Sequence, residues 1–128
     1  MKNFIPKAKD DHEATEVLRT MAWEDIYPYA GELLTWLQDM NWPVGIEARD
    51  ILLPHVDSIQ EHIIEILRGN DGMWKYWILY SLIDYADETH IGPDLLQEIK
   101  RIAGDPTEGD KREEIDEAAK EILERFSA

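Results

Sequence analysis

Residues 33–52 read LLTWLQDMNWPVGIEARDIL, which is two apolar helical stretches separated by a turn at Pro43. The pattern recurs as IIEILRGNDGMWKYWILYSL at residues 63–82 and, with a longer loop, as LLQEIKRIAGDPTEGDKREEIDEAAKEIL at residues 95–123. One helical hairpin cannot bury its own apolar face, so repeated hairpins stack on one another. The repetition therefore predicts an all-α fold, a short right-handed α-solenoid formed by residues 1–128 as a single domain.

Apolar residues recur every three or four positions along most of the chain, which predicts about seven helices and no strand. Residues 1–10, with three lysines and Pro6, are expected to form an extended lead-in. Asp110 with Glu113 resembles a capping box that would begin the last helix. The expected helices cover approximately residues 12–23, 26–40, 43–52, 54–69, 73–86, 93–104 and 110–126.

The second helices of the three hairpins can be aligned with one another. Residues spaced by four lie on one helix face, so each aligned triplet is predicted to be buried. Residues 73–86 are apolar on two sides, which is typical of a central helix, and Tyr85 is expected on one of its apolar faces. The triplets are Val44, Ala48 and Leu52; Trp74, Ile78 and Leu82; and Ile115, Ala119 and Leu123.

The first hairpin has two adjacent leucines, Asp39 at the end of its first helix, Val44 at the start of its second and the small Ala48 within it. This pattern resembles the HEAT repeat family, and the resemblance covers the chain from the second helix onward. The second hairpin departs from it, with Gly69 in place of Asp39 and Trp74 in place of Val44. The resemblance implies stacked hairpins whose second helices line a concave, partner-binding face.

Four segments carry a second resemblance: IPKAKDDHE from Ile5, ELLTWLQDMNWPV from Glu32, WKYWIL from Trp74 and RIAGDPTE from Arg101. With them the whole chain is similar to a family of small single-domain bacterial proteins of unknown function. This resemblance implies a bacterial origin. It implies no activity.

The chain has 13 Lys and Arg against 28 Asp and Glu, a formal net charge of -15. Such a charge repels phosphate groups, so we expect neither nucleic acid nor an anionic membrane surface as a partner. The charge favours a protein partner, and a basic one in particular. The alternative is that it serves only solubility.

No cysteine is present, which excludes disulfides and thiol catalysis. We find no signal-peptide pattern and no apolar run of ~20 residues, so the protein is expected to be cytoplasmic. His55 and His62 share a face of one predicted helix but lack a third ligand. We therefore expect no metal, no cofactor and no catalytic residue.

The same alignment places Ile46, Tyr76 and Glu117 side by side on the exposed face of the second helices, with Asp50, Tyr80 and Glu121 one turn further on. Tyrosine with carboxylates suits a basic protein segment, because the rings supply contact area and the carboxylates pair with Lys or Arg. The alternative is that the tyrosines are packing residues of a central helix. We call this set the second-helix strip: Ile46, Asp50, Tyr76, Tyr80, Asp84, Glu117 and Glu121, continued by Arg125.

Three functions remain open from the sequence. The first is a non-enzymatic protein-interaction module that uses the strip, for example an immunity-type inhibitor of a basic partner. The second is a small-ligand-binding protein or enzyme with a pocket at Tyr76, Tyr80 and Asp84. The third is a structural or regulatory subunit without a pocket. The oligomeric state stays unknown.

Overall fold

The computed structural model of the protein describes residues 4–127, and within these residues every regular element is helical. The all-α class is therefore confirmed. The α-helices are α1 (His12–Thr20), α2 (Trp23–Ile26), α3 (Ala30–Leu34), α4 (Pro43–Leu52), α5 (Gln60–Leu67), α6 (Gly72–Trp77), α7 (Pro93–Gly104), α8 (Glu108–Arg112) and α9 (Ile115–Ser127). Short 3-10 segments are η1 (Tyr27–Tyr29), η2 (Thr35–Gln38), η3 (Leu53–Ile59) and η5 (Glu88–His90), and η4 (Ile78–Ile83) is a π-helix.

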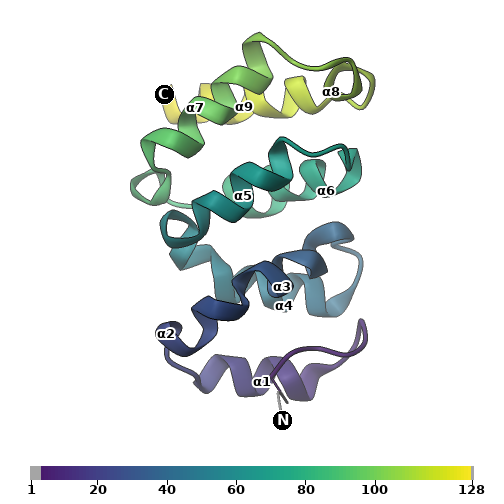
Figure 1. Ribbon diagram of the computed structural model, residues 1–128, viewed down its shortest axis with the longest axis vertical. Coiled ribbons are helices and arrows are strands. Elements are labelled where there is room, and N and C mark those ends of the chain that lie inside the picture. The colour runs from purple at the N-terminus through teal and green to yellow at the C-terminus, as the bar shows by residue number, and fades with distance from the viewer. Residues whose placement is uncertain (1–3, 128) are drawn as a thin grey trace.

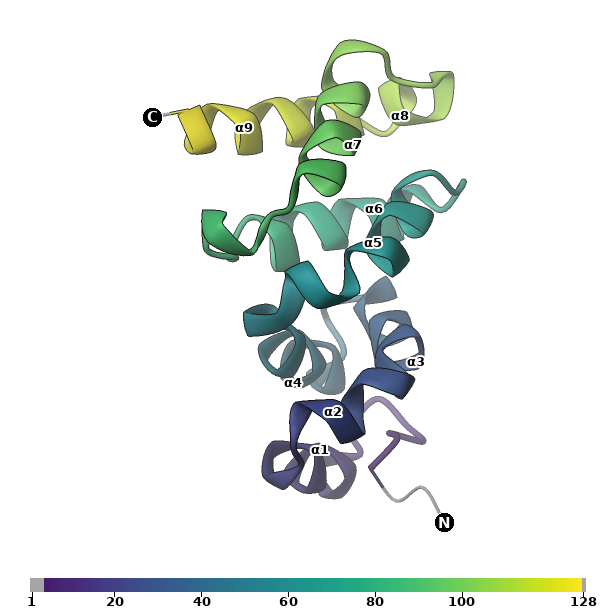
Figure 2. The same cartoon turned by 60° about the vertical axis from the view of Figure 1, so that its left-hand side comes forward.

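Successive helices form pairs that lie one above another along the long axis, as Figures 1 and 2 show. The first pair is α3 with α4, next to α1 at the N-terminal end. The second is α5 with α6, and the third is α7 with α9 at the C-terminal end. Helix α5 contacts α7, and α6 contacts α9, so the second and third pairs are joined through both of their helices. The first pair meets the second where η2 contacts α6.

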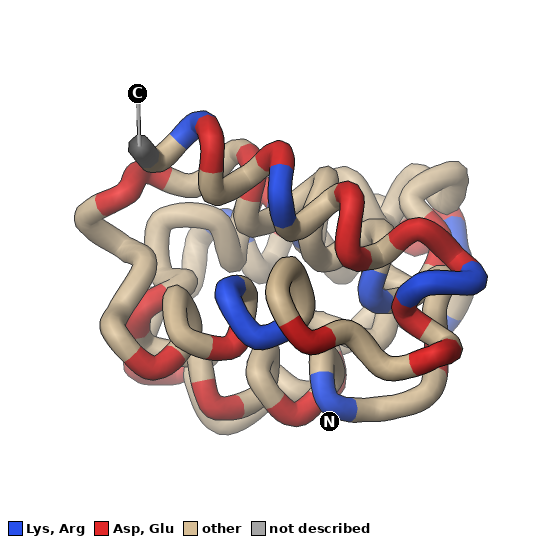
Figure 3. Tube along the Cα trace, turned by 90° about the horizontal axis from the view of Figure 1, so that it is seen from above, with Lys and Arg blue, Asp and Glu red and all other residues tan. Residues whose placement is uncertain are grey.

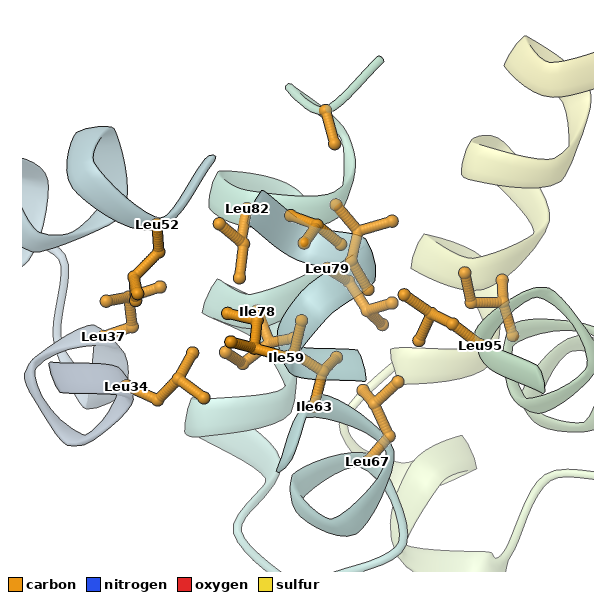
Figure 4. Close-up of a cluster of buried hydrophobic side chains, with 14 of the residues drawn as sticks. Leu34, Leu37, Leu52, Ile59, Ile63, Leu67, Ile78, Leu79, Leu82 and Leu95 are labelled. Atoms are coloured by element: carbon orange, nitrogen blue, oxygen red, sulfur yellow. The ribbon is translucent and has the colours of Figure 1, made fainter. Parts of the chain in front are cut away.

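The core runs without interruption through the pairs. Figure 4 shows Leu34, Leu37 and Leu52 facing Ile78 and Leu82 of the next pair. The aligned triplets are buried as predicted, except that Trp74 and Leu123 at their ends are half-buried. Burial of these side chains is the main stabilising contribution of the fold.

The central helix consists of α6 followed by η4, and η4 is buried on two sides. In η4 the backbone changes from α-helical to the wider π-helical geometry. The amide of Asp84 donates to the carbonyl of Leu79 at 2.9 Å, a bond that spans five residues instead of four. The regular helix ends at Ile83, so Tyr85 leaves the apolar face and is 64% exposed. The predicted burial of Tyr85 is wrong for this reason.

The last helix begins later than predicted. Thr107 caps α8, and its hydroxyl and the Asp110 carboxylate each accept the other's backbone N–H at 3.1 Å. The capping box therefore lies three residues before the expected Asp110–Glu113 pair. Glu114 then takes a positive φ of 60°, which separates α8 from α9.

The N-terminal segment packs on the domain. Residues 4–11 form turns and bends, which differs from the extended lead-in expected for residues 1–10; residues 1–3 lie outside the described part. The ring of Phe4 meets the ring of Tyr29 edge-on, with 5.0 Å between centroids. No helix in the described part of the chain is both long enough and apolar enough to cross a membrane.

Candidate partner-binding strip

The second-helix strip is carried by α4, by α6 with η4, and by α9. Helix α9 contacts both α6 and η4, and η4 contacts η3, the segment that follows α4. Ile46 is 44% exposed and Tyr76 is 37% exposed, so apolar surface is present at the middle of the strip. The aromatic rings of Tyr76 and Tyr80 pack edge-on, 4.8 Å apart. The strip is therefore a surface of the protein and only partly a packing layer.

Tyr80 connects η4 to α9 by a hydrogen bond. Its hydroxyl donates to Oε2 of Glu121 on α9 at 2.8 Å. Burial, followed by the nearby Glu121 carboxylate, raises the pKa of Tyr80 to about 12. The phenol therefore stays protonated near neutral pH and acts as a hydrogen-bond donor.

Asp84 and Arg125 lie together at one end of the strip. Arg125 Nε donates to Asp84 Oδ1 at 3.0 Å, and its guanidinium also donates to the carbonyl of Ile83 at 3.2 Å. Both side chains are about one-third exposed, so this pair contributes only modestly to stability.

Arg49 joins α4 to the central helix and was not singled out by the sequence. Its Nε lies 2.8 Å from Asp50 Oδ1, and Nη1 donates to the carbonyl of Ser81 at 3.0 Å. The guanidinium carbon lies 4.8 Å from the ring centroid of Tyr85. Arg49 and Tyr85 therefore extend the strip. The only sequence signal for them was that Arg49 adjoins Asp50.

The carboxylates of the strip have donors within the chain, whereas its apolar side chains remain exposed. Glu117 is 62% exposed and lies 3.5 Å from Lys120 Nζ. Tyr76, Tyr80 and Asp84 do not line any of five surface clefts of 240 to 540 Å³ in the described part of the chain. These clefts give no support to the pocket alternative.

An ionic network centred on buried side chains joins α6, α7 and α8, with Arg68 added from the end of α5, and Arg101 Nη1 lies 3.9 Å from Asp110 Oδ2. Lys75 Nζ on α6 lies 2.7 Å from Asp110 Oδ1, and both side chains are at most 5% exposed. Glu98 on α7 is 1% exposed and is bound by Arg68 at 3.2 Å and Arg101 at 3.0 Å. This network could not be predicted from the sequence, because charged side chains usually face solvent.

Asp110 stays ionised inside the network. Burial acts to raise its pKa, but hydrogen bonds from Lys75 and from the Thr107 backbone outweigh burial and lower it. A buried ion pair of this kind holds α6 and α8 in one arrangement, and removal of one member leaves an uncompensated charge.

A second acidic cluster fixes α1 to α4. Oε1 of Glu47 lies 2.8 Å from Nδ1 of His12, and the hydroxyl of the buried Thr15 donates to its other oxygen. Burial acts to raise the pKa of Glu47, but these hydrogen bonds and the charges of His12 and Arg19 lower it overall. The cluster therefore has a structural role in holding the first helix.

His55 and His62 do not share a helix, contrary to the sequence prediction. The backbone of His55 is non-helical, at φ -123° and ψ 22°, and its ring stacks on Trp23 with 3.9 Å between centroids. His62 lies on α5 and lines a cleft to which His55 does not contribute. Among the described residues, no three His, Asp or Glu side chains are grouped as metal ligands.

The tryptophans are packing residues. Trp74 Nε1 donates to the carbonyl of Leu34 at 3.0 Å, and Trp36 meets Trp42 edge-on at 5.7 Å. Trp36, Trp74 and Trp77 all pack against the buried core. They are therefore not part of the exposed strip.

The fold and the strip together define a small all-helical protein with an exposed aromatic and acidic surface. Figure 3 shows Asp and Glu spread along the whole chain, with fewer Lys and Arg between them. Residues 4–123 match the family described as "Domain of unknown function (DUF5071)", and the chain belongs to that family. A comparison with curated proteins found no match.

Proposed function

We propose that the protein is a HEAT-like, short right-handed α-solenoid, and that its second-helix strip binds a basic segment of another protein. The stacked helix pairs in Figures 1 and 2 support the solenoid. In such stacks each pair packs on the next in the same orientation, so the second helices lie side by side and form a continuous surface. The proposed protein is a single-domain, cytoplasmic, bacterial one without enzymatic activity.

One observation carries the binding proposal. The guanidinium of Arg49 lies 4.8 Å from the Tyr85 ring and 2.8 Å from the Asp50 carboxylate, at the exposed edge of the strip. The strip thus already holds arginine from its own chain by ring contact and charge pairing. An arginine or lysine of a partner would use the same chemistry at Tyr76 and Glu117.

The overall charge favours the same kind of partner. A net charge of -15 attracts a basic protein over distances of the order of the Debye length, and it repels nucleic acid and anionic membranes. One concrete form is an immunity-type inhibitor that neutralises a cationic bacterial toxin. Binding in that case buries the strip against the basic surface of the toxin.

The test is capture of partners from a bacterial lysate on the immobilised protein. The strip variant carries Asp50→Asn, Glu117→Gln and Glu121→Gln, whose amides still accept hydrogen bonds from Arg49 and Tyr80. The matched control removes the same number of charges from exposed residues outside the strip: Glu16→Gln, Glu32→Gln and Glu108→Gln.

We expect a basic protein to be retained by the wild type and the control and to be reduced about tenfold on the strip variant, which corresponds to ~1.4 kcal/mol. Retention should also fall when the salt concentration is raised from low to moderate. Equal retention by all three proteins would contradict the proposal that the strip binds the partner. Equal loss in the control and the strip variant would show a dependence on net charge alone.

A further inference from the structure

A cleft of about 320 Å³ lies between α3 and the turn that joins α5 to α6. Ile66 supplies accessible apolar surface above the buried Leu34, and the indole of Trp74 forms part of the wall. Gly31 adds no side chain at this point, and a Cβ atom placed there would lie 3.6 Å from the imidazole of His62. The cleft shares no lining residue with the second-helix strip.

The indole in the wall is held in one orientation. Trp74 Nε1 donates to the carbonyl of Leu34 at 3.0 Å, and the Trp74 backbone N–H donates to Asp71 Oδ1 at 3.1 Å. Leu34 is fully buried, whereas Trp74 and Ile66 are half-buried and remain accessible from the cleft. The cleft is therefore already formed and does not require a rearrangement of the core to admit a side chain.

Two carboxylates line the same cleft without a Lys or Arg beside them. Glu65 and Asp71 are both exposed, and neither forms an ion pair with a Lys or Arg of the described residues. Lys and Arg are also absent from the described lining. The cleft of about 540 Å³ beside α7 is different, because Arg68 and Arg101 line it and already pair with Glu98.

We propose that this cleft binds the guanidinium end of an arginine side chain presented by a partner protein. A planar guanidinium can stack on the Trp74 indole and donate within its plane to the carboxylates of Glu65 and Asp71. The methylene stem of arginine then covers the apolar surface of Ile66. The site is separate from the second-helix strip and does not depend on partner binding there.

The chemistry of the lining selects this ligand over others. An anionic group is repelled by the two carboxylates, and an uncharged apolar side chain offers neither of them a cationic partner. An ammonium ion pairs with a carboxylate as a point charge, but it lacks the flat surface that stacks on an indole. Arginine is therefore expected to bind more tightly than lysine.

The probe is N-acetyl-arginine-N-methylamide, which represents an arginine within a chain. It is titrated into the ¹⁵N-labelled protein, and the indole N–H resonance of Trp74 is followed by NMR. We expect a saturable shift, a weaker affinity by about threefold or more for the lysine analogue, and no response to the norleucine analogue. Equal binding of the norleucine or the lysine analogue would overturn the guanidinium assignment.

The matched variants are Glu65→Gln, Asp71→Asn and Glu61→Gln. Asparagine still caps α6, so Asp71→Asn removes charge while keeping the cap. Glu61 is exposed on α5, one turn before Glu65, and lies outside this cleft. We expect the first two variants to weaken probe binding about threefold each and Glu61→Gln to leave it unchanged.

An equal loss in Glu61→Gln would show a response to net charge and would overturn the proposal, as would unchanged binding in both cleft variants. Free arginine that binds at least about tenfold more tightly than the capped probe would assign the cleft to a small molecule instead. The strip variant Asp50→Asn/Glu117→Gln/Glu121→Gln is expected to bind the probe normally. Failure of one site is therefore distinguishable from failure of the other.

Discussion

Ala48 lies fully buried on α4, within the hydrophobic core. Ala48→Glu should destabilise the protein by about 3–5 kcal/mol or prevent folding, because it places an unpaired charge in the core. Ile46→Glu, two residues earlier and 44% exposed, should change stability by less than about 1 kcal/mol. Urea unfolding followed by tryptophan fluorescence measures both. Equal midpoints for Ala48→Glu and the wild type would mean that α4 is rotated relative to the structure.

Asp110 gives a pH dependence with a definite sign. Its folded pKa is lowered, so its contribution to stability is present above the unfolded value of about 3.9 and is lost as the pH falls through the folded value. Asp110→Asn leaves Lys75 buried without a counter-ion, so it should cost about 3 kcal/mol at pH 7. Below about pH 4 the difference from the wild type should begin to narrow, because the unfolded wild-type carboxyl takes up a proton while the folded one is still ionised.

The control for this experiment is Asp105→Asn, which is exposed just before α8. This substitution should leave the decrease in the free energy of unfolding at acidic pH the same as in the wild type. A gap between Asp110→Asn and the wild type that stays constant from pH 7 to about pH 3 would contradict the buried ion pair.

Individual buried residues could be predicted from the sequence where helical spacing alone decides burial. Ala48, Ile78 and Ala119 are examples, and all three are fully buried. The Lys75–Asp110 pair could not be predicted, because its members lie 35 residues apart and meet only when α8 folds back on α6. Spacing describes one helix face, whereas such a pair depends on how two elements approach each other.

At the scale of the element, Gly45 allows η2 and α4 to approach closely. A Cβ atom at Gly45 would lie 2.8 Å from the Trp36 carbonyl oxygen and 3.1 Å from the Asp39 carbonyl oxygen. Gly45→Ala should therefore destabilise by about 1–3 kcal/mol, even though alanine favours helices. At Gly104, the last residue of α7, no atom lies within 4 Å of an added Cβ.

Gly104→Ala is the matched control, and it should leave the protein as stable or raise its stability by about 0.4–1 kcal/mol. Thermal unfolding of the two variants measures the difference. A Gly45→Ala variant that is more stable than the wild type would show that the two elements can separate without cost.

Helix existence followed from the sequence, but local backbone geometry did not. Each of the seven expected helices has a counterpart, since apolar spacing and Pro43 or Pro93 mark helices clearly. The π-helical turn at Ile78–Ile83 and the break at Glu114 were not predicted. Both depend on hydrogen-bond geometry within a few residues, which apolar periodicity does not encode.

For the whole molecule, polar contacts repeat between neighbouring pairs. Arg49 reaches the Ser81 carbonyl, Tyr80 reaches Glu121, and Arg125 reaches Asp84. These contacts follow the second helices from one end of the stack to the other. The general position of the strip could therefore be predicted from the alignment of the hairpins, whereas the intramolecular partners of its carboxylates could not.

The proposed binding face can be tested most directly by titrating the captured partner into the ¹⁵N-labelled protein and mapping the perturbed amide resonances. If the strip is the interface, the shifts should cluster on α4, η4 and α9, around Tyr76, Tyr80 and Glu121. They should be lost in the strip variant and retained in the matched charge control. Shifts confined to α3, α5 and α7, with none on α4, η4 and α9, would contradict a partner-binding strip on the second helices.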